Sequence, residues 1–167
     1  MKNPSKQEYI AHRFLKAGID ENSLATIVYE KQKPFNPDLT YEHVIEALQS
    51  VMRKRETQHY LVTALSLDEL AQESKLPEPF QSIVEDDNPQ FGVDEIIGLG
   101  ASMLGGTISF TNFGALDARK EGIVAILNDE HKKGHTISTF TDDVLSAVIA
   151  LAEAKVAHDH HIPKKIK

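Results

Sequence analysis

FTDDVLSAVIALAEA, residues 140–154, is the stretch that decides the fold of this 167-residue chain. Its apolar residues recur at helical spacing, which predicts a buried helix from about Thr139 or Thr141 to His158. Two adjacent acids, Asp142 and Asp143, stand at the start of that helix. The side chains that we expect to be buried along it are Val144, Leu145, Val148, Ile149 and Ala152.

A second acidic pair, Asp94 and Glu95, lies in FGVDEIIGLGASMLGG, residues 91–106, and also opens an apolar segment. One carboxylate at a helix start is ordinary, because the free N–H groups and the helix dipole favour negative charge. Adjacent acids repel each other, and a cation between them removes that repulsion. The two pairs therefore suggest a metal site, with separate solvated helix caps as the alternative.

A third acid is followed by a cation in FGALDARKEG, residues 113–122, where Asp117 precedes Lys120. A lysine can bind phosphate as a point charge, so carboxylates with one lysine suggest a divalent metal that faces a phosphate. The alternative is a lysine that points into solvent. The GHTIS loop, Gly134 to Ser138, is a candidate anion-binding connector in which His135 would donate a proton, or else a plain connector.

Composition favours an all-α protein. Hydrophobic residues make up 41% of the chain and aromatic residues only 7%, with no Trp. Eighteen Lys and Arg against 25 Asp and Glu give a net charge of -7, which argues against a nucleic-acid partner. The chain has no Cys, which excludes disulfides and thiol chemistry, and we recognise no signal peptide. We expect a cytoplasmic, homo-oligomeric protein with one domain over residues 1–167.

The helix signals predict a single array of six to eight helices. We expect TISFTNFG, residues 107–114, to be helical or an irregular connector, since no partner strand is evident. We also expect a capping box, Ser66 with Glu69, to begin a new helix after a short one over residues 57–64. The remaining expected helices start at Ser5, at Asp20 or Ser23, at Thr40 and at Val93.

Three longer stretches together resemble the phosphatidylglycerophosphatase A family, and most closely its soluble, YutG-like branch, which includes the low-temperature-requirement protein type. They are GVDEIIGLGASMLGG (92–106), ISFTNFGALDARKEGIVAILND (108–129) and FTDDVLSAVIALAEAKVAH (140–158). The resemblance implies an all-α fold and a Mg²⁺-dependent phosphatase that converts phosphatidylglycerophosphate to phosphatidylglycerol. Its partner would be a phospholipid headgroup or a small phosphoester, with peripheral contact to a membrane.

The resemblance also assigns roles to the acidic elements. By motif, the metal ligands fall on Asp94, Glu95, Asp142 and Asp143. Asp117 would ligate the metal or position water, and Lys120 would bind the phosphate.

Two departures from the family keep other functions open. The sequence has no recognised transmembrane segment or Gly-Thr-x-Gly motif, and ARKEG replaces the Trp- and Pro-rich stretch around the lysine. The alternatives are a soluble phosphatase of a small phosphoester and a non-catalytic helical interaction protein with a vestigial metal site.

Overall fold

The structure is a computed structural model that describes residues 3–161. These residues form nine α-helices and one 3₁₀ turn and no strand, which confirms the predicted all-α fold. The expected domain also includes residues 1–2 and 162–167, which lie outside the described part. The elements are α1 (Lys6–Lys16), α2 (Glu21–Gln32), α3 (Tyr41–Met52), α4 (Arg55–Gln72), α5 (Phe80–Asp86), α6 (Val93–Ser102), η1 (Met103–Gly105), α7 (Gly106–Arg119), α8 (Ile123–Lys132) and α9 (Thr141–His161).

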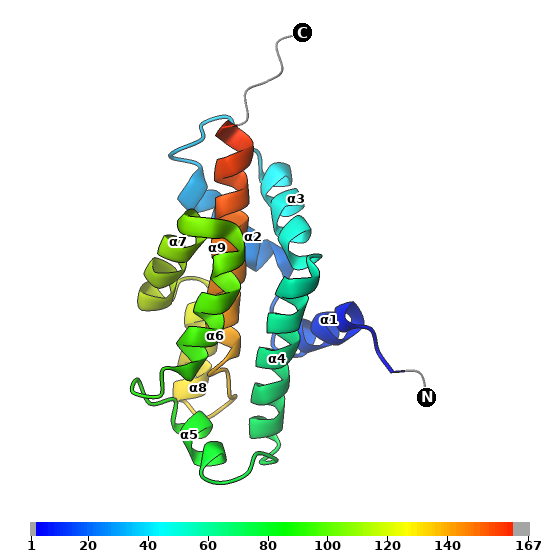
Figure 1. Ribbon diagram of the computed structural model, residues 1–167, viewed down its shortest axis with the longest axis vertical. Coiled ribbons are helices and arrows are strands. Elements are labelled where there is room, and N and C mark those ends of the chain that lie inside the picture. Colours follow the sequence, from blue (N-terminus) through cyan, green and yellow to red (C-terminus); the bar gives the residue numbers. More distant parts are fainter. Residues whose placement is uncertain (1–2, 162–167) are drawn as a thin grey trace.

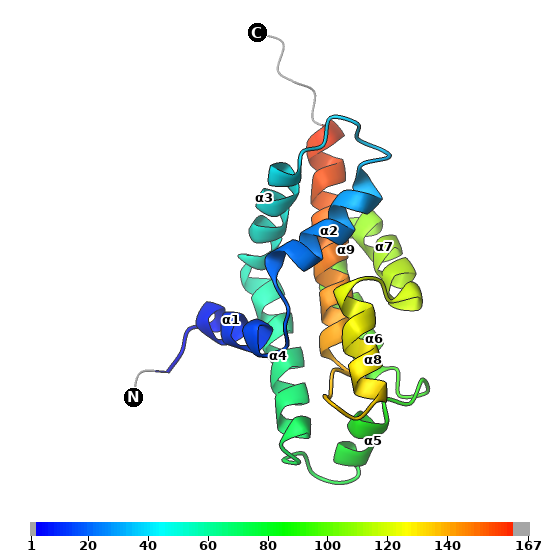
Figure 2. The same cartoon turned by 180° about the vertical axis from the view of Figure 1, so that it is seen from behind.

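Helix α9 is the centre of the array. It runs along the long axis of the molecule, with α6 in front of it in one view and α2 and α8 in front of it in the opposite view (Figures 1 and 2). It contacts α2, α3, α4, α6, α7 and α8. All five side chains expected to be buried in it are inaccessible to solvent, as the periodicity predicts.

The caps predicted for the first three helices are confirmed. Ser5 and Thr40 accept hydrogen bonds from the N–H groups of Glu8 and His43, and Asp20 accepts one from Ser23. Each bond satisfies one of the N–H groups that a helix start leaves without an intrahelical partner. The sequence alone therefore placed the starts of α1 and α3, and of the two alternatives that it left for α2, Asp20 and Ser23, the structure has Asp20 as the cap.

The capping box predicted at Ser66 is wrong, because α4 is continuous from Arg55 to Gln72. No Gly or Pro interrupts that segment. The two box residues instead hold α1 on α4: Ser66 Oγ donates to Tyr9 Oη at 3.1 Å, and Glu69 accepts from Tyr9 Oη at 2.8 Å. Glu69 also accepts from Arg13 Nη1 at 2.8 Å. The two residues that resemble a local capping motif thus form a tertiary contact between α1 and α4.

Asp68, on α4, anchors the start of α9. Its buried carboxylate accepts hydrogen bonds from Phe140 N at 3.1 Å and from Thr141 N at 2.8 Å. This side chain acts as the N-terminal cap of a helix that is distant in sequence. It fixes the end of α9 from which Asp142 and Asp143 project.

Gly98 allows α6 to pack closely on α9. A Cβ at this position would lie 2.8 Å from the Phe113 ring and 3.0 Å from the carbonyl oxygen of Asp143. Such distances are shorter than van der Waals contact. The missing side chain therefore brings the first turns of α6 and α9, and the acidic pair of each, close together.

Helices α6 and α7 form an apolar hairpin. By length and composition alone, the stretch Val93–Arg119 could cross a membrane, although the sequence analysis found no such segment. The chain changes direction at η1, so the stretch is not one straight helix (Figure 1). Only 28% of its most apolar window is buried, which leaves apolar side chains on the surface.

We predict that Gly98→Ala lowers the free energy of unfolding by about 1–3 kcal/mol, because the added methyl group overpacks the contact between α6 and α9. Gly114→Ala is the matched control, since a Cβ there meets nothing within 4 Å. That control should be neutral or stabilise the protein by up to about 1 kcal/mol. Urea denaturation measures both changes, and equal stabilities for the two variants would contradict the close contact.

We predict that Asp68→Ala destabilises the protein by about 2–4 kcal/mol, because two buried N–H groups lose their acceptor. Asp68→Asn keeps a carbonyl oxygen at this position and should cost roughly half as much. The same urea titrations report both values. If the Ala and Asn variants were equally stable, Asp68 would not act as the cap of α9.

Candidate functional site

One cleft of about 410 Å³ is lined by all six residues that the sequence analysis named. Three helix ends meet at it. The start of α6 supplies the first acidic pair, the end of α7 supplies the third acid and the lysine, and the start of α9 supplies the second acidic pair. In that order the residues are Asp94, Glu95, Asp117, Lys120, Asp142 and Asp143.

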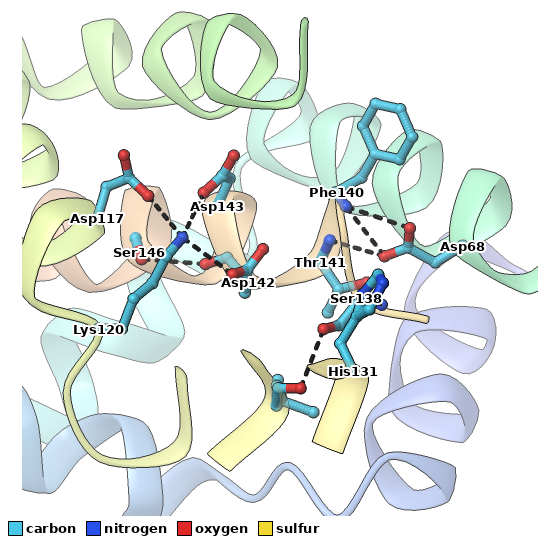
Figure 3. Close-up of polar contacts among 11 residues, drawn as sticks. Asp68, Asp117, Lys120, His131, Ser138, Phe140, Thr141, Asp142, Asp143 and Ser146 are labelled. Atoms are coloured by element: carbon cyan, nitrogen blue, oxygen red, sulfur yellow. Dashed lines mark hydrogen bonds and ion pairs between the residues drawn. The ribbon is translucent and has the colours of Figure 1, made fainter. Parts of the chain in front are cut away.

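Lys120 lies between three carboxylates (Figure 3). Its Nζ is 2.6 Å from Asp117 Oδ1, 2.9 Å from Asp142 Oδ2 and 3.0 Å from Asp143 Oδ1. The Asp142 and Asp143 side chains are almost fully buried, whereas the lysine side chain is 26% exposed. Burial of two adjacent carboxylates without a cation would be costly, so Lys120 offsets their charge.

The backbone of Lys120 helps to direct this side chain. Lys120 follows α7 with φ at 44°, in the left-handed region that non-glycine residues seldom adopt. Its N–H donates to Leu116 O at 2.8 Å and closes the last turn of the helix. Asp87, another residue of the cleft, ends α5 with the same unusual φ. Asp residues adopt this region readily, so the strain lies at Lys120, and strained residues are common at functional sites.

A second grouping, the acid trio, consists of Asp94, Glu95 and Asp143. One carboxylate oxygen from each residue lies within 4.8 Å of the other two. Asp94 Oδ1 and Glu95 Oε2 are buried and have no hydrogen-bond partner among the described residues. Unpartnered buried carboxylate oxygens are rare in folded proteins, and a bound divalent cation would satisfy them. Asp143 belongs to both groupings, since it also contacts Lys120.

The electrostatics of the cleft are dominated by burial and by like charge. Burial, reinforced by Glu95, raises the pKa of Asp94 to about 8. Burial and then Asp142 raise the pKa of Asp143 to about 10, while burial raises that of Asp142 to about 6 against the influence of Lys120. Burial lowers the pKa of Lys120, but the carboxylates outweigh it and keep the pKa well above its ordinary value. The site therefore holds less positive charge than its carboxylates require, and a bound cation would favour their ionised form.

The GHTIS loop leads into the start of α9 and is joined to α8 by hydrogen bonds. Ser138 N–H donates to His131 Nδ1 at 3.1 Å, so the proton on His131 Nε2 is the one that Glu85 O accepts at 3.0 Å. Thr139 Oγ1 donates to Val84 O at 2.7 Å. His135, the proposed proton donor, is exposed and pairs with Glu130 instead of lining the cleft. Only the end of the loop is buried, where Ser138 and the following Thr139 connect the start of α9 to α8 and α5.

Several residues of the cleft were missed by the sequence analysis. Asp87 and Asn88 precede Pro89 in a turn, and the adjacent acids at 86–87 were a signal that resembled the other two pairs. The other missed residues are Ala118 of α7 and Asn128 and Lys132 of the second half of α8, which carry no motif of their own. Lys132 adds a second cation to the rim of the cleft.

Comparison with known proteins relates this site to a family. The family model described as phosphatidylglycerophosphatase A matches residues 17–158. The uncharacterized protein YpjQ of Bacillus subtilis is 43% identical over 145 residues, which cover 87% of this chain and 80% of that protein. The uncharacterized protein YutG of the same organism is 37% identical over 146 residues, which cover 87% of each protein.

Solved structures show the same fold. The low temperature requirement C protein of Listeria monocytogenes has a TM-score of 0.88 and 34% identity, over 96% of this chain and all of that one. A Bacillus stearothermophilus protein of unknown function has a TM-score of 0.85 and 38% identity, over 95% and 97% of the two chains. The match of the family model over most of the sequence, together with these relatives, shows that the chain belongs to the phosphatidylglycerophosphatase A family.

Proposed function

We propose that this protein is a Mg²⁺-dependent phosphatase that hydrolyses the phosphomonoester of phosphatidylglycerophosphate to phosphatidylglycerol and phosphate. Membership of the family supports phosphoester hydrolysis in general. The observation that carries the proposal is the acid trio, with its two unpartnered buried oxygens, next to a lysine in one cleft. A purely structural role would account neither for the unpartnered buried oxygens nor for the partly exposed lysine beside them.

The donor set fits Mg²⁺. Carboxylate oxygens are the ligands that this ion prefers, and it commonly keeps several waters and shares phosphate oxygens. Asp94, Glu95 and Asp143 would hold the ion, and Asp142 completes the proposed set. When bound, Mg²⁺ would polarise the phosphoryl group and lower the pKa of a coordinated water.

Lys120 is the proposed phosphate-binding group. Its ammonium is partly exposed to the cleft and has three carboxylates as present partners. A cation held by the acids would release Lys120 from that role and leave it to stabilise negative charge on the phosphoryl oxygens. Asp117, 2.6 Å from Nζ, would orient the lysine and position the attacking water.

Exposed apolar side chains on the α6–α7 hairpin support a lipid substrate. Val93 and Ile96, which flank the first acidic pair, are 48% and 63% exposed, and Met103 and Phe110 on the same hairpin are also exposed. Apolar patches of this kind occur where proteins meet membranes or other subunits. We therefore propose a cytoplasmic, homo-oligomeric enzyme whose α6–α7 hairpin contacts the lipid at the membrane surface.

We predict that the protein releases phosphate from phosphatidylglycerophosphate in mixed micelles with Mg²⁺ and not with EDTA, and that Asp142→Ala lowers the rate at least ~100-fold. Asp129→Ala, at an exposed acid of α8, is the matched control and should retain the wild-type rate. Phosphate release that is insensitive to EDTA, or an active Asp142→Ala variant, would reject the acidic cleft as the catalytic site.

Two further assays separate the alternatives. Rapid hydrolysis of water-soluble glycerol 3-phosphate without activity on the micelles would indicate a soluble phosphatase of small phosphoesters. No hydrolysis of either compound, in protein that binds Mg²⁺ by calorimetry, would indicate a non-catalytic protein that has kept the metal site.

We predict that Lys120→Met unfolds at a lower temperature than wild type in EDTA, by the equivalent of about 2–3 kcal/mol, because buried carboxylates lose their cation. Mg²⁺ should raise the melting temperature of this variant more than that of wild type, because the ion replaces the lost charge. Lys133→Met removes an exposed lysine and serves as the control. Equal responses of the three proteins to Mg²⁺ would show that the ion does not bind beside Lys120.

A further inference from the structure

A second cavity, of about 240 Å³, lies between α2, α7 and α9 and plays no part in the proposed reaction. Its wall includes Asn112, Leu116 and Arg119 of α7, Lys31 of α2 and Glu153 of α9. The end of α7 separates it from the acidic cleft, since Asp117 and Lys120 line the cleft while Leu116 and Arg119 line this cavity. The two cavities therefore share one helical turn as a wall.

Glu153 is the unusual residue of this cavity. Its side chain is 1% exposed, on a helix whose neighbouring residues are apolar and fully buried. Asn112 Nδ2 donates to Glu153 Oε2 at 2.6 Å, whereas Oε1 is buried with no hydrogen-bond partner among the described residues. A half-satisfied buried carboxylate is destabilising, so its presence requires a reason beyond packing.

The rim of the cavity carries the opposite charge. Lys31 is already paired, since its Nζ lies 2.8 Å from Glu121 Oε2. Arg119 is exposed and forms no ion pair within residues 3–161. The cavity thus presents an unsatisfied carboxylate oxygen at depth and an unpaired guanidinium at its mouth.

We propose that this cavity binds a small zwitterion, with a primary ammonium group donating to Glu153 Oε1 and an anionic group held by Arg119. A charged donor is the strongest partner for a buried carboxylate, and a guanidinium binds carboxylates and phosphates through paired hydrogen bonds. The volume of about 240 Å³ is that of roughly eight water molecules in the liquid, which restricts the ligand to a small one. Amino carboxylates and amino phosphates share the required chemistry.

The charge state of Glu153 gives the proposal a pH dependence. Burial raises the pKa of Glu153 to about 7, against the Asn112 hydrogen bond and the charge of Lys31, while Glu121 acts in the same direction as burial. Arg119 is the remaining charged group that lines the cavity. The ammonium group binds the ionised form, so affinity should rise by about tenfold from pH 6 to pH 8.

The test uses the full chain labelled with ¹⁵N, in EDTA at pH 8, titrated with O-phosphoethanolamine and separately with β-alanine. The side-chain amide of Asn112, which contacts Glu153, is the reporter for this cavity, and the amide of Asn128 reports on the acidic cleft. Ethanolamine and ethyl phosphate each supply one charge of the zwitterion and serve as ligand controls. The two zwitterions distinguish an amino phosphate from an amino carboxylate.

We expect at least one zwitterion to shift the Asn112 signal saturably and to bind tenfold or more tightly than either single-charge control. Glu153→Gln and Arg119→Gln should each weaken that binding by about tenfold or more, whereas Arg55→Gln, at an exposed arginine of α4, should not change it. Arg119 is exposed, so its variant keeps the test valid if Glu153→Gln does not fold. The proposal would be overturned by no saturable shift up to 10 mM, by shifts confined to Asn128, or by unchanged binding in Arg119→Gln.

Discussion

The burial of two adjacent carboxylates at the start of α9 is the constraint on which the rest of the structure depends. Asp142 and Asp143 are almost fully buried in the wall of the cleft, where water screens their mutual repulsion only weakly. Lys120 offsets their charge, and Asp68 satisfies the N–H groups of the turn that precedes them. Helices α4 and α7 are therefore tied to α9 by polar contacts as well as by packing.

The parts of the fold that follow from local chemistry could be predicted from the sequence. The caps at Ser5, Asp20 and Thr40 act on N–H groups three residues away, and the apolar spacing of α9 directly determines which side chains are buried. The helix boundary predicted at Ser66 is wrong because Ser66 donates its hydrogen bond to a neighbouring helix and does not cap a helix of its own. Local patterns therefore identify helices better than they identify boundaries inside a long one.

The six residues proposed from the sequence do line one cleft, but neither their arrangement nor the further residues of the cleft could be predicted. The spacing of the acids suggested a cluster, yet nothing local indicates that Asp143 is shared between Lys120 and the acid trio. The contact of Asp68 with Thr141 joins residues far apart in the chain, and it exists only after α4 and α9 have packed. Lys120 reaches the carboxylates from a backbone conformation that its residue type does not favour.

The position of α9 in the chain has a consequence for biosynthesis. Among the described elements, the helix on which six of the other helices pack is translated after all of them. At the usual rate of translation, on the order of ten seconds separate the emergence of α2 from that of α9. During that time the apolar faces of α2, α3 and α6 have no central helix to cover them, and such exposed surface favours aggregation of the nascent chain.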